Sequence, residues 1–158
     1  MNEQEGVIKY ELEHQQMPMT EFFSVKQISA WRAILFRLGL LGQDPDRYDN
    51  LGFGNISHRV KPQSNQFIIS GTQTGHIEYL CSEQFVLVVK AEPRQNRIHS
   101  CGLIKPSSEA LTMLVFIAWM LRLMPLFMCI VQRSGEIPKC LICLIFLPIF
   151  LMALLLWQ

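Results

Sequence analysis

The feature that most restricts how this 158-residue chain can fold is an abrupt change of composition at Met113. Residues 1–112 hold every acidic residue except Glu136, and they also hold all four histidines. Residues 113–158 contain no Asp, Asn, His, Tyr or Thr, and bulky apolar residues dominate them. The charged residues of this second part are Arg122, Arg133, Glu136 and Lys139. We therefore divide the chain into a domain of mixed composition, 1–112, and a hydrophobic tail, 113–158.

Charge and cysteine usage limit the class of protein. The net charge of +1 gives no reason to expect binding to nucleic acid. Residues 1–14 are charged and lack the apolar stretch of a signal peptide, so we expect the domain to be cytoplasmic. The five cysteines are too scattered for a disulfide scaffold, and a reducing compartment agrees with that. Cys140 and Cys143 have CxxC spacing, but they lie in an apolar run with no second pair and are interpreted as small hydrophobic residues.

Apolar periodicity predicts helices alternating with strands. Thr20 and Glu21 fit the start of a helix that runs to Gly42. The apolar residues expected on its core-facing side are Phe23, Val25, Ile28, Trp31, Ile34, Leu35 and Leu38. QFIISG (66–71) and QFVLVVKAEP (84–93) are typical of strands, and EGVIKYELEH (5–14) of an extended segment. The sequence then predicts a polar turn and a helix capped by Ser107 or Ser108, which gives a layered α/β or α+β domain.

Three short clusters in the domain combine hydroxyl groups with unhindered backbone N–H groups. They are Gly54-Asn55-Ile56-Ser57, Thr74-Gly75 and Ser107-Ser108, the last at a predicted helix start. Such groups suit a phosphate or carboxylate oxygen, because the N-terminus of a helix carries partial positive charge. Each cluster alone is more typical of an ordinary turn or cap. Their order and spacing along the chain carry more information than any one of them.

DNLGFGNISHRV (49–60), QFIISGTQTGHIEYL (66–80) and GLIKPSSEALT (102–112) together resemble the N-terminal part of the class II aldolase/adducin family. The resemblance covers roughly residues 20–112. It implies a three-layer α/β/α domain, here only partial, and an assembly that is usually a homotetramer with sites at subunit interfaces. The enzymes of the family include sugar-phosphate aldolases, an epimerase and a dehydratase, whereas adducin uses the same fold without catalysis. The fold therefore does not decide the function.

The resemblance also implies a site. Gly54, Asn55, Ser57, Thr74, Gly75, Ser107 and Ser108 match the pocket that binds the substrate phosphate, and Glu109 matches the acid/base carboxylate. In the family a divalent metal, usually zinc, stabilises the oxyanion that this proton transfer forms. Two of its histidine ligands are a His-x-His pair on a strand soon after the PSSE turn, and the third lies downstream.

This sequence lacks those ligands. No histidine follows His99, no His-x-His pair occurs, and His14, His58, His76 and His99 show no ligand spacing. We therefore expect no metal cofactor and no turnover from the chain as written. A sheet that depends on strands after the PSSE turn is also expected to keep an open, aggregation-prone edge.

Two accounts of the tail remain open. In the first, residues 110–131 and 140–157 are apolar helices that associate with a membrane, the second being 18 residues without a charge. Arg122 and Pro125 disfavour the first span. In the second account the tail is read out of frame. Phe127-Met128-Cys129-Ile130 is encoded TTY ATG TGY ATH, and reading one base earlier gives His or Tyr, Val, then His or Tyr.

Three functions follow from these alternatives. The chain is a truncated, inactive relative of metal-dependent aldehyde-lyases that retains an anion pocket. Alternatively, it is a non-catalytic, adducin-like binding module for a sugar phosphate or a similar small anion. The third alternative is a small membrane-associated protein with a cytoplasmic N-terminal domain.

Overall fold

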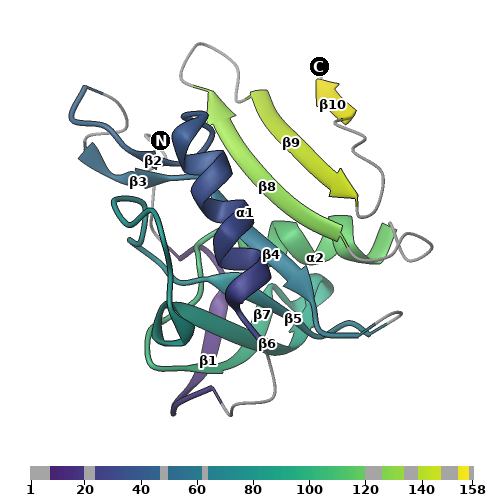
Figure 1. Ribbon diagram of the computed structural model, residues 1–158. Coiled ribbons are helices and arrows are strands. Elements are labelled where there is room, and N and C mark those ends of the chain that lie inside the picture. The colour runs from purple at the N-terminus through teal and green to yellow at the C-terminus, as the bar shows by residue number, and fades with distance from the viewer. Residues whose placement is uncertain are drawn as a thin grey trace.

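The computed structural model describes residues 8–19, 24–46, 50–61, 64–119, 126–133, 139–146 and 153–156. Eight strands form one sheet in the order β1-β7-β6-β5-β4-β8-β9-β10, and a separate pair, β2 and β3, forms a small ribbon. Five strands of the large sheet come from the first part of the chain: β1 Glu11–Gln16, β4 Asn55–Arg59, β5 Phe67–Ser70, β6 Phe85–Glu92 and β7 Arg97–Gly102. The ribbon is β2 Gly42–Gln43 with β3 Gly52–Phe53, and the helices are α1 Lys26–Arg37 and α2 Ala110–Trp119. Figure 1 shows this arrangement.

The pairing of the large sheet is antiparallel except at one edge. β1 runs parallel to β7, with Leu12 opposite Ile98, whereas β4, β5, β6 and β7 form successive antiparallel pairs. A register shift between Val88 and Lys90 interrupts the β6–β7 pairing. Short 3-10 turns, Ser82–Gln84 and Pro93–Gln95, lie at the two ends of β6.

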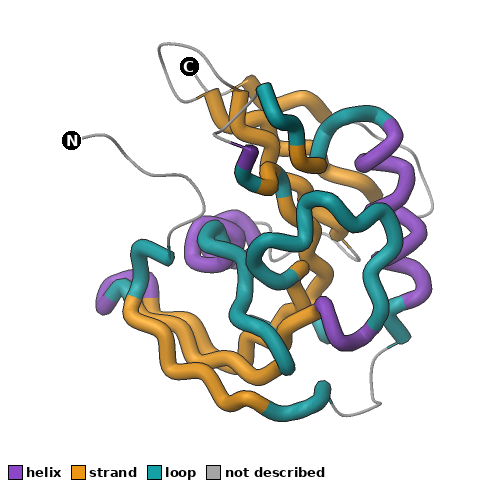
Figure 2. The backbone as a smooth tube through the Cα atoms, turned by 90° about the vertical axis from the view of Figure 1, so that its left-hand side faces the viewer, coloured by secondary structure: helices purple, strands orange, loops and turns teal. Residues whose placement is uncertain are grey.

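Two hydrophobic cores lie on opposite faces of this sheet, because neighbouring residues of a strand point to opposite faces. On one face, Ile56, Ile68 and Phe85 pack with Ile28 and Leu35 of α1. On the other face, Phe67, Ile69, Val86, Val88 and Ile98 pack with Ala110, Met113 and Leu114 of α2. The sheet therefore carries one helix on each side (Figure 2).

The predicted first helix exists, but its ends and its buried side differ from the prediction. α1 ends at Arg37, and Gly39 with a φ of +66° follows its C-cap, so Gly39 rather than Gly42 terminates it. Ile34 and Leu38 were expected on the core side and are 46% and 63% exposed. Ser29 and Arg32 are buried in their place, because both make hydrogen bonds to the loop after β5. Thr20, Glu21 and Phe23 lie outside the described residues.

The predicted strands at 66–71 and 84–93 are confirmed as β5 and β6, and the extended segment at 5–14 overlaps β1. β7 was not predicted, because its sequence RIHSCG is rich in polar residues. Its burial alternates strictly, with Ile98, Ser100 and Gly102 buried.

α2 spans the compositional boundary, and Met113 and Leu114 are fully or almost fully buried. The expectation of a helical tail needs correction beyond Trp119. Residues 126–133, 139–146 and 153–156 form the strands β8 Leu126–Arg133, β9 Lys139–Phe146 and β10 Ala153–Leu156. Over the part of the chain that the structure describes, no helix is both long and apolar enough to cross a membrane. Short apolar runs fit a strand as well as a helix, and here they pair with a sheet.

β8 occupies the edge of the sheet that was expected to stay open. It pairs antiparallel with β4, and Ile130 and Met128 stand opposite Asn55 and Ser57. β9 and β10 extend the sheet in antiparallel order. The edge of β4 is therefore covered.

Candidate functional site

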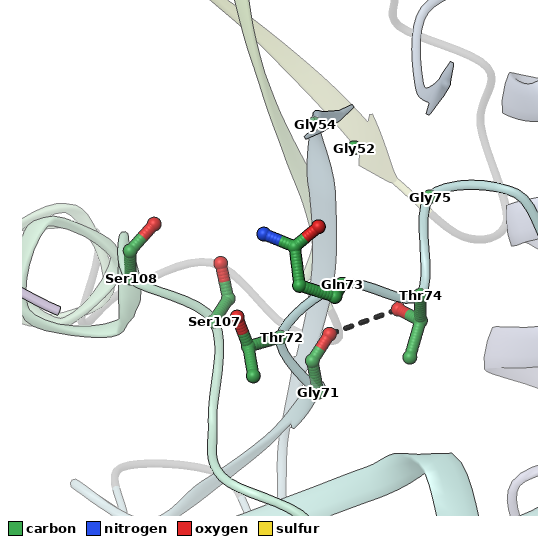
Figure 3. A pocket seen from close by; sticks show the side chains of 9 residues that line it. All are labelled: Gly52, Gly54, Gly71, Thr72, Gln73, Thr74, Gly75, Ser107 and Ser108. Carbon is green, nitrogen blue, oxygen red and sulfur yellow. Dashed lines mark hydrogen bonds between the residues drawn. The ribbon is translucent and has the colours of Figure 1, made fainter. Parts of the chain in front are cut away.

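A small pocket lies where three segments distant in the sequence meet (Figure 3). The segments are the β3–β4 connection, the loop that follows β5, and the turn that leads into α2. The residues that line it are Gly52, Gly54, Gly71, Thr72, Gln73, Thr74, Gly75, Ser107 and Ser108. The cavity volume is about 30 Å³, which admits a small polar group and not a whole sugar.

The structure brings five of the predicted binding residues to this pocket: Gly54, Thr74, Gly75, Ser107 and Ser108. Asn55 and Ser57 do not line it. They are buried on β4, at 2% and 1% exposure, in register with Ile130 and Met128 of β8. Asn55 Oδ1 is buried and finds no hydrogen-bond partner among the described residues. Buried polar atoms without a partner are rare, but this oxygen lies outside the pocket lining.

Gly52, Gly71, Thr72 and Gln73 also line the pocket and were not predicted. The signal for Gly71, Thr72 and Gln73 was present in the sequence, because the Gly-Thr-Gln-Thr-Gly run to which they belong offers many backbone N–H groups in one turn. Gln73 has a φ of +55°, so the loop turns sharply at this residue. In Figure 3 the Gln73 amide and the Ser107 hydroxyl point into the same space.

Two glycines are required by close packing at the pocket. Gly54 has a φ of +73°, and an added Cβ would lie 2.6 Å from Leu41 Cβ and 2.9 Å from the Leu40 carbonyl oxygen. At Gly75 an added Cβ would overlap with the Gly42 carbonyl oxygen and would lie 2.6 Å from Gly52 Cα. Backbones at these positions approach more closely than any side chain allows, so the β2–β3 ribbon lies directly against the pocket loop.

The turn before α2 is held on several sides. The Ser107 N–H donates to the Ser70 carbonyl at 3.2 Å, and Gly71 and Pro106 form a β-bridge. Tyr10 Oη donates to the Ser107 carbonyl at 2.9 Å. Ser107 Oγ accepts the Glu109 N–H at 3.3 Å, as a serine does at a helix start. The two pocket serines therefore lie on a turn with a fixed backbone.

The loop after β5 is held from the side of α1. Arg32, which is only 1% exposed, donates to the Thr74 carbonyl through Nη2 at 2.6 Å and to the Ile77 carbonyl through Nε at 2.9 Å. Thr74 Oγ1 donates back to the Gly71 carbonyl at 2.9 Å, which closes the turn (Figure 3). The Thr72 N–H donates to the Lys105 carbonyl at 2.9 Å and ties this loop to the turn before α2.

Glu109 follows the pocket serines and is half-buried, and its Oε2 accepts a hydrogen bond from Thr112 Oγ1 at 3.1 Å. Its carboxylate lies near Tyr10. Burial, and secondly the charge of Glu109, raises the pKa of Tyr10 above its ordinary value, so the Tyr10 hydroxyl stays a hydrogen-bond donor. A carboxylate therefore stands at the N-terminus of α2, beside hydroxyl and N–H groups that suit an oxyanion.

The residues present do not fit the divalent metal of the aldolase family. No histidine lines the pocket, and the described part of the chain contains no cluster of His, Cys, Asp and Glu able to hold a metal ion. His14 Nδ1 lies 2.9 Å from Ser100 Oγ, His58 is half-buried on β4, and His76 is exposed. The positions of β8 that pair with Asn55 and Ser57 carry Ile130 and Met128, which are not zinc ligands.

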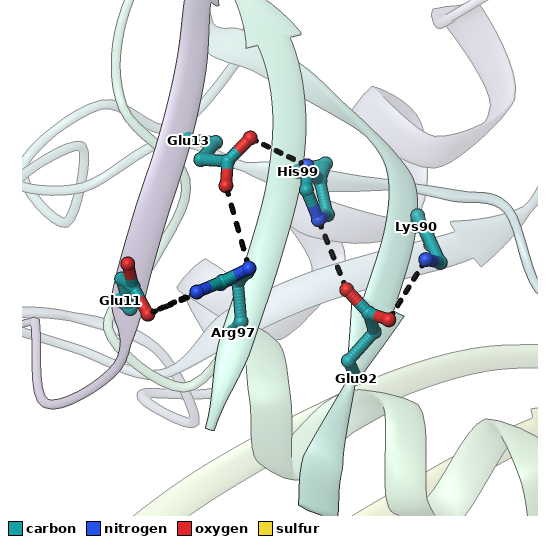
Figure 4. Close-up of polar contacts among 6 residues, drawn as sticks. All are labelled: Glu11, Glu13, Lys90, Glu92, Arg97 and His99. Carbon is teal, nitrogen blue, oxygen red and sulfur yellow. Dashed lines mark hydrogen bonds and ion pairs between the residues drawn. The ribbon is translucent and has the colours of Figure 1, made fainter. Parts of the chain in front are cut away.

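His99 takes part in a surface network across β1, β7 and β6 (Figure 4). Its Nδ1 lies 3.0 Å from a Glu13 carboxylate oxygen, and its Nε2 lies 3.1 Å from a Glu92 carboxylate oxygen. Arg97 bonds Glu11 at 2.9 Å, and Lys90 bonds Glu92 at 2.7 Å. The hydrogen bond from Lys90, and secondly that from His99, lowers the pKa of Glu92. These ion pairs join the edge strand β1 to the sheet and lie away from the pocket.

Comparisons with known proteins found no matching family model, no matching curated protein and no matching solved structure. The expected relation to the class II aldolase/adducin family therefore depends only on the three sequence motifs and their spacing.

Proposed function

We propose that this chain is a non-catalytic binding domain for a small oxyanion, such as the phosphate group of a sugar phosphate, related to the class II aldolase/adducin family. One observation carries the proposal. Hydroxyl and N–H groups from three separate segments, 54, 74–75 and 107–108, converge on one cavity of about 30 Å³. Helix starts and exposed backbone N–H groups are common sites for phosphate.

The volume and the donors agree on the kind of ligand. A cavity of this size takes a phosphate or carboxylate head group and leaves the remainder of the ligand outside. Its lining offers hydroxyls, an amide and glycine backbone, so affinity comes from neutral hydrogen-bond donors together with the positive end of α2. Glu109 supports recognition of a ligand hydroxyl rather than of a second anionic group, because like charges repel.

An aldolase-type reaction is not proposed. Proton transfer by a carboxylate such as Glu109 needs a group that stabilises the resulting oxyanion, and in the family this group is a metal. The described histidines do not supply its ligands. Zinc content and retro-aldol turnover of the purified protein test this part, and metal-dependent turnover would contradict it.

We propose further that the tail, residues 113–158, is an out-of-frame continuation. The observation that favours this reading is the register of β8: Met128 and Ile130, where the alternative frame reads His or Tyr, stand opposite Ser57 and Asn55. The family places its His-x-His pair on a strand in this part of the chain. Sequencing the gene across codons 105–135 decides the matter, and an alternative frame without downstream histidine codons would contradict it.

The binding proposal is tested by the stabilisation that phosphate gives. At ten times its dissociation constant, a ligand of the folded state adds about 1.4 kcal/mol to the free energy of unfolding. That corresponds to a rise in melting temperature of roughly 3–6 °C for a chain of this size. We expect this rise with inorganic phosphate and with a sugar phosphate for the wild type, and a much smaller one for Ser107→Ala and Ser108→Ala.

A matched control separates binding from turn stability. Ser64 Oγ accepts the N–H of the residue two positions later, Gln66, as Ser107 Oγ accepts the N–H of Glu109, and Ser64 lies outside the pocket. Ser64→Ala therefore removes a similar turn contact and should keep the full response to phosphate. An equal response of all variants, or no response of the wild type, would contradict the proposed function.

A further inference from the structure

Two peptide groups of the pocket are each held from behind by a buried side-chain donor. Arg32 Nη2 donates to the Thr74 carbonyl at 2.6 Å, and Tyr10 Oη donates to the Ser107 carbonyl at 2.9 Å. Arg32 is 1% exposed and comes from α1, whereas Tyr10 is 7% exposed and precedes β1. Tyr10 belongs to the core on the face that α2 covers, whereas Arg32 lies on α1, which packs on the opposite face, and both reach the same site.

Each carbonyl also accepts a backbone N–H, Thr74 from Ile77 at 3.1 Å and Ser107 from Ala110 at 3.0 Å. The side-chain donor is therefore the second of two contacts that fix the direction of the next N–H group. In a planar trans peptide the C=O of one residue and the N–H of the following residue point in opposite directions. A donor on the Thr74 carbonyl therefore directs the Gly75 N–H away from Arg32, and a donor on the Ser107 carbonyl directs the Ser108 N–H away from Tyr10. Gly75 and Ser108 both line the pocket. Within the described part of the chain, neither N–H group has a hydrogen-bond acceptor.

We propose that Arg32 and Tyr10 are positioning residues of the anion pocket, which direct the N–H groups of Gly75 and Ser108 toward the bound oxyanion. The inference rests on the proposed function and specifies how that site is assembled. Neither residue needs to touch the ligand, because each acts through a backbone carbonyl. Arg32 also places a positive charge behind the pocket loop, and Tyr10 places none there.

Burial favours this role over a packing role for both side chains. A buried guanidinium is unfavourable unless it is hydrogen-bonded, and Arg32 donates to the Thr74 and Ile77 carbonyls, which belong to the pocket loop and its continuation. The Tyr10 ring packs with the core under α2, while its hydroxyl leaves that core to reach Ser107. Phenylalanine would fill the same space without the donor.

The variants follow from these contacts. Tyr10→Phe removes only the hydroxyl, and Arg32→Lys keeps the charge but loses the planar pair of donors. Ser29→Ala is the matched control, because Ser29 lies on α1 beside Arg32 and its Oγ accepts the Leu80 N–H at 3.0 Å, on the same loop but outside the pocket. All three variants remove a buried contact to a backbone group.

The measurement is the change in the amide resonances of Gly75 and Ser108 when inorganic phosphate is added to the full chain. In the wild type both amide protons shift. In Tyr10→Phe the Ser108 response falls while the Gly75 response stays, and in Arg32→Lys the pattern is reversed. We expect each of these variants to bind phosphate about tenfold more weakly, as for one weakened hydrogen bond to a charged group. Ser29→Ala keeps both responses and the wild-type affinity.

Two outcomes overturn the inference. One is an equal loss of both amide responses in Tyr10→Phe, and the other is a loss in Ser29→Ala as large as in Arg32→Lys, since either result indicates general loosening of the loops. Residual dipolar couplings of the ligand-free protein give a test that needs no binding. Tyr10→Phe should reorient the Ser108 N–H alone, and unchanged couplings would refute the positioning role. If the wild type binds no phosphate, the proposed function fails, while these couplings still decide whether the peptide groups are held as described.

Discussion

Gly54 offers a quantitative test of how the pocket is built. It combines a φ of +73° with close packing, because an added Cβ would lie 2.6 Å from Leu41 Cβ and 2.9 Å from the Leu40 carbonyl oxygen. Leu41 is 1% exposed, and it packs in the core beneath α1. Gly39, which follows the C-cap of α1, is a matched control. Its φ is +66°, and an added Cβ would have nothing within 4 Å.

The two substitutions separate backbone strain from steric overlap. An alanine in the left-handed region costs about 1–2 kcal/mol, which applies to both Gly39→Ala and Gly54→Ala. Overpacking in a filled core costs about 1–3 kcal/mol more, and this applies to Gly54→Ala alone. We therefore expect Gly54→Ala to lose about 2–5 kcal/mol of the free energy of unfolding and Gly39→Ala about 1–2 kcal/mol.

Equilibrium unfolding in urea measures both losses. The slope of the unfolding free energy against urea concentration should be the same in both variants and the wild type if unfolding is two-state. Equal losses in the two variants would refute the reasoning, because they would mean that Leu41 does not confine the chain at Gly54. Gly54→Ala should also lose its response to phosphate at temperatures where it is still folded, whereas Gly39→Ala should keep it.

Two further predictions concern pH and the tail. Burial lowers the pKa of both His14 and His58, so below about pH 6.5 the unfolded chain binds protons at these sites that the folded chain does not, and stability falls as the pH falls. His58→Gln should make the loss of stability with falling pH smaller. Urea titrations between pH 7.5 and 5, roughly the range in which a histidine titrates, measure it. An unchanged dependence of the unfolding free energy on pH would contradict a His58 that is neutral in the folded state. Met128→His combined with Ile130→His places two histidines opposite Ser57 and Asn55 and should confer zinc binding in equilibrium dialysis. Met128→His with Cys129→His is the control, because adjacent strand positions face opposite sides of the sheet, and equal zinc affinities would contradict the strand conformation of β8.

The clusters that form the pocket were predictable, and their surroundings were less so. The predicted residues that line the pocket are glycines or short polar residues in turns: Gly54, Thr74, Gly75, Ser107 and Ser108. Residues of these types in a sequence indicate turns with exposed backbone N–H groups. The cavity exists only because long-range contacts such as the Thr72 N–H to the Lys105 carbonyl join two loops. The spacing of the motifs identifies the candidate binding residues, but it does not predict which of them lie together in the folded chain.

Arg32 and Tyr10 had no signal of this kind. Each acts on a backbone carbonyl, and a carbonyl is present at every residue, so no motif marks the pair. Arg32 also breaks the expected pattern of α1, where Ile34 and Leu38 were placed in the core and are exposed. A charged residue is placed on the solvent side by any rule of periodicity, and the hydrogen bonds to the Thr74 and Ile77 carbonyls help to explain why Arg32 is buried.

The tail shows the limit of composition as a guide. Apolar runs at 126–133 and 139–146 fit a membrane helix, a core helix or a strand, and periodicity does not separate these cases. These runs form strands because β8 pairs with the edge of β4, a strand about 70 residues earlier in the chain. The motif resemblance predicted that a strand was needed there, although the tail itself was expected to be helical.

The central claim is that neutral donors from three distant loops bind one oxyanion. Amide chemical-shift mapping of the uniformly labelled protein with inorganic phosphate tests it most directly. The account predicts saturable shifts confined to residues 71–75, residues 107–109 and the neighbourhood of Gly54. Shifts spread over the surface or centred on the Arg97–Glu11 network, or no saturable shift in these three segments, would contradict it.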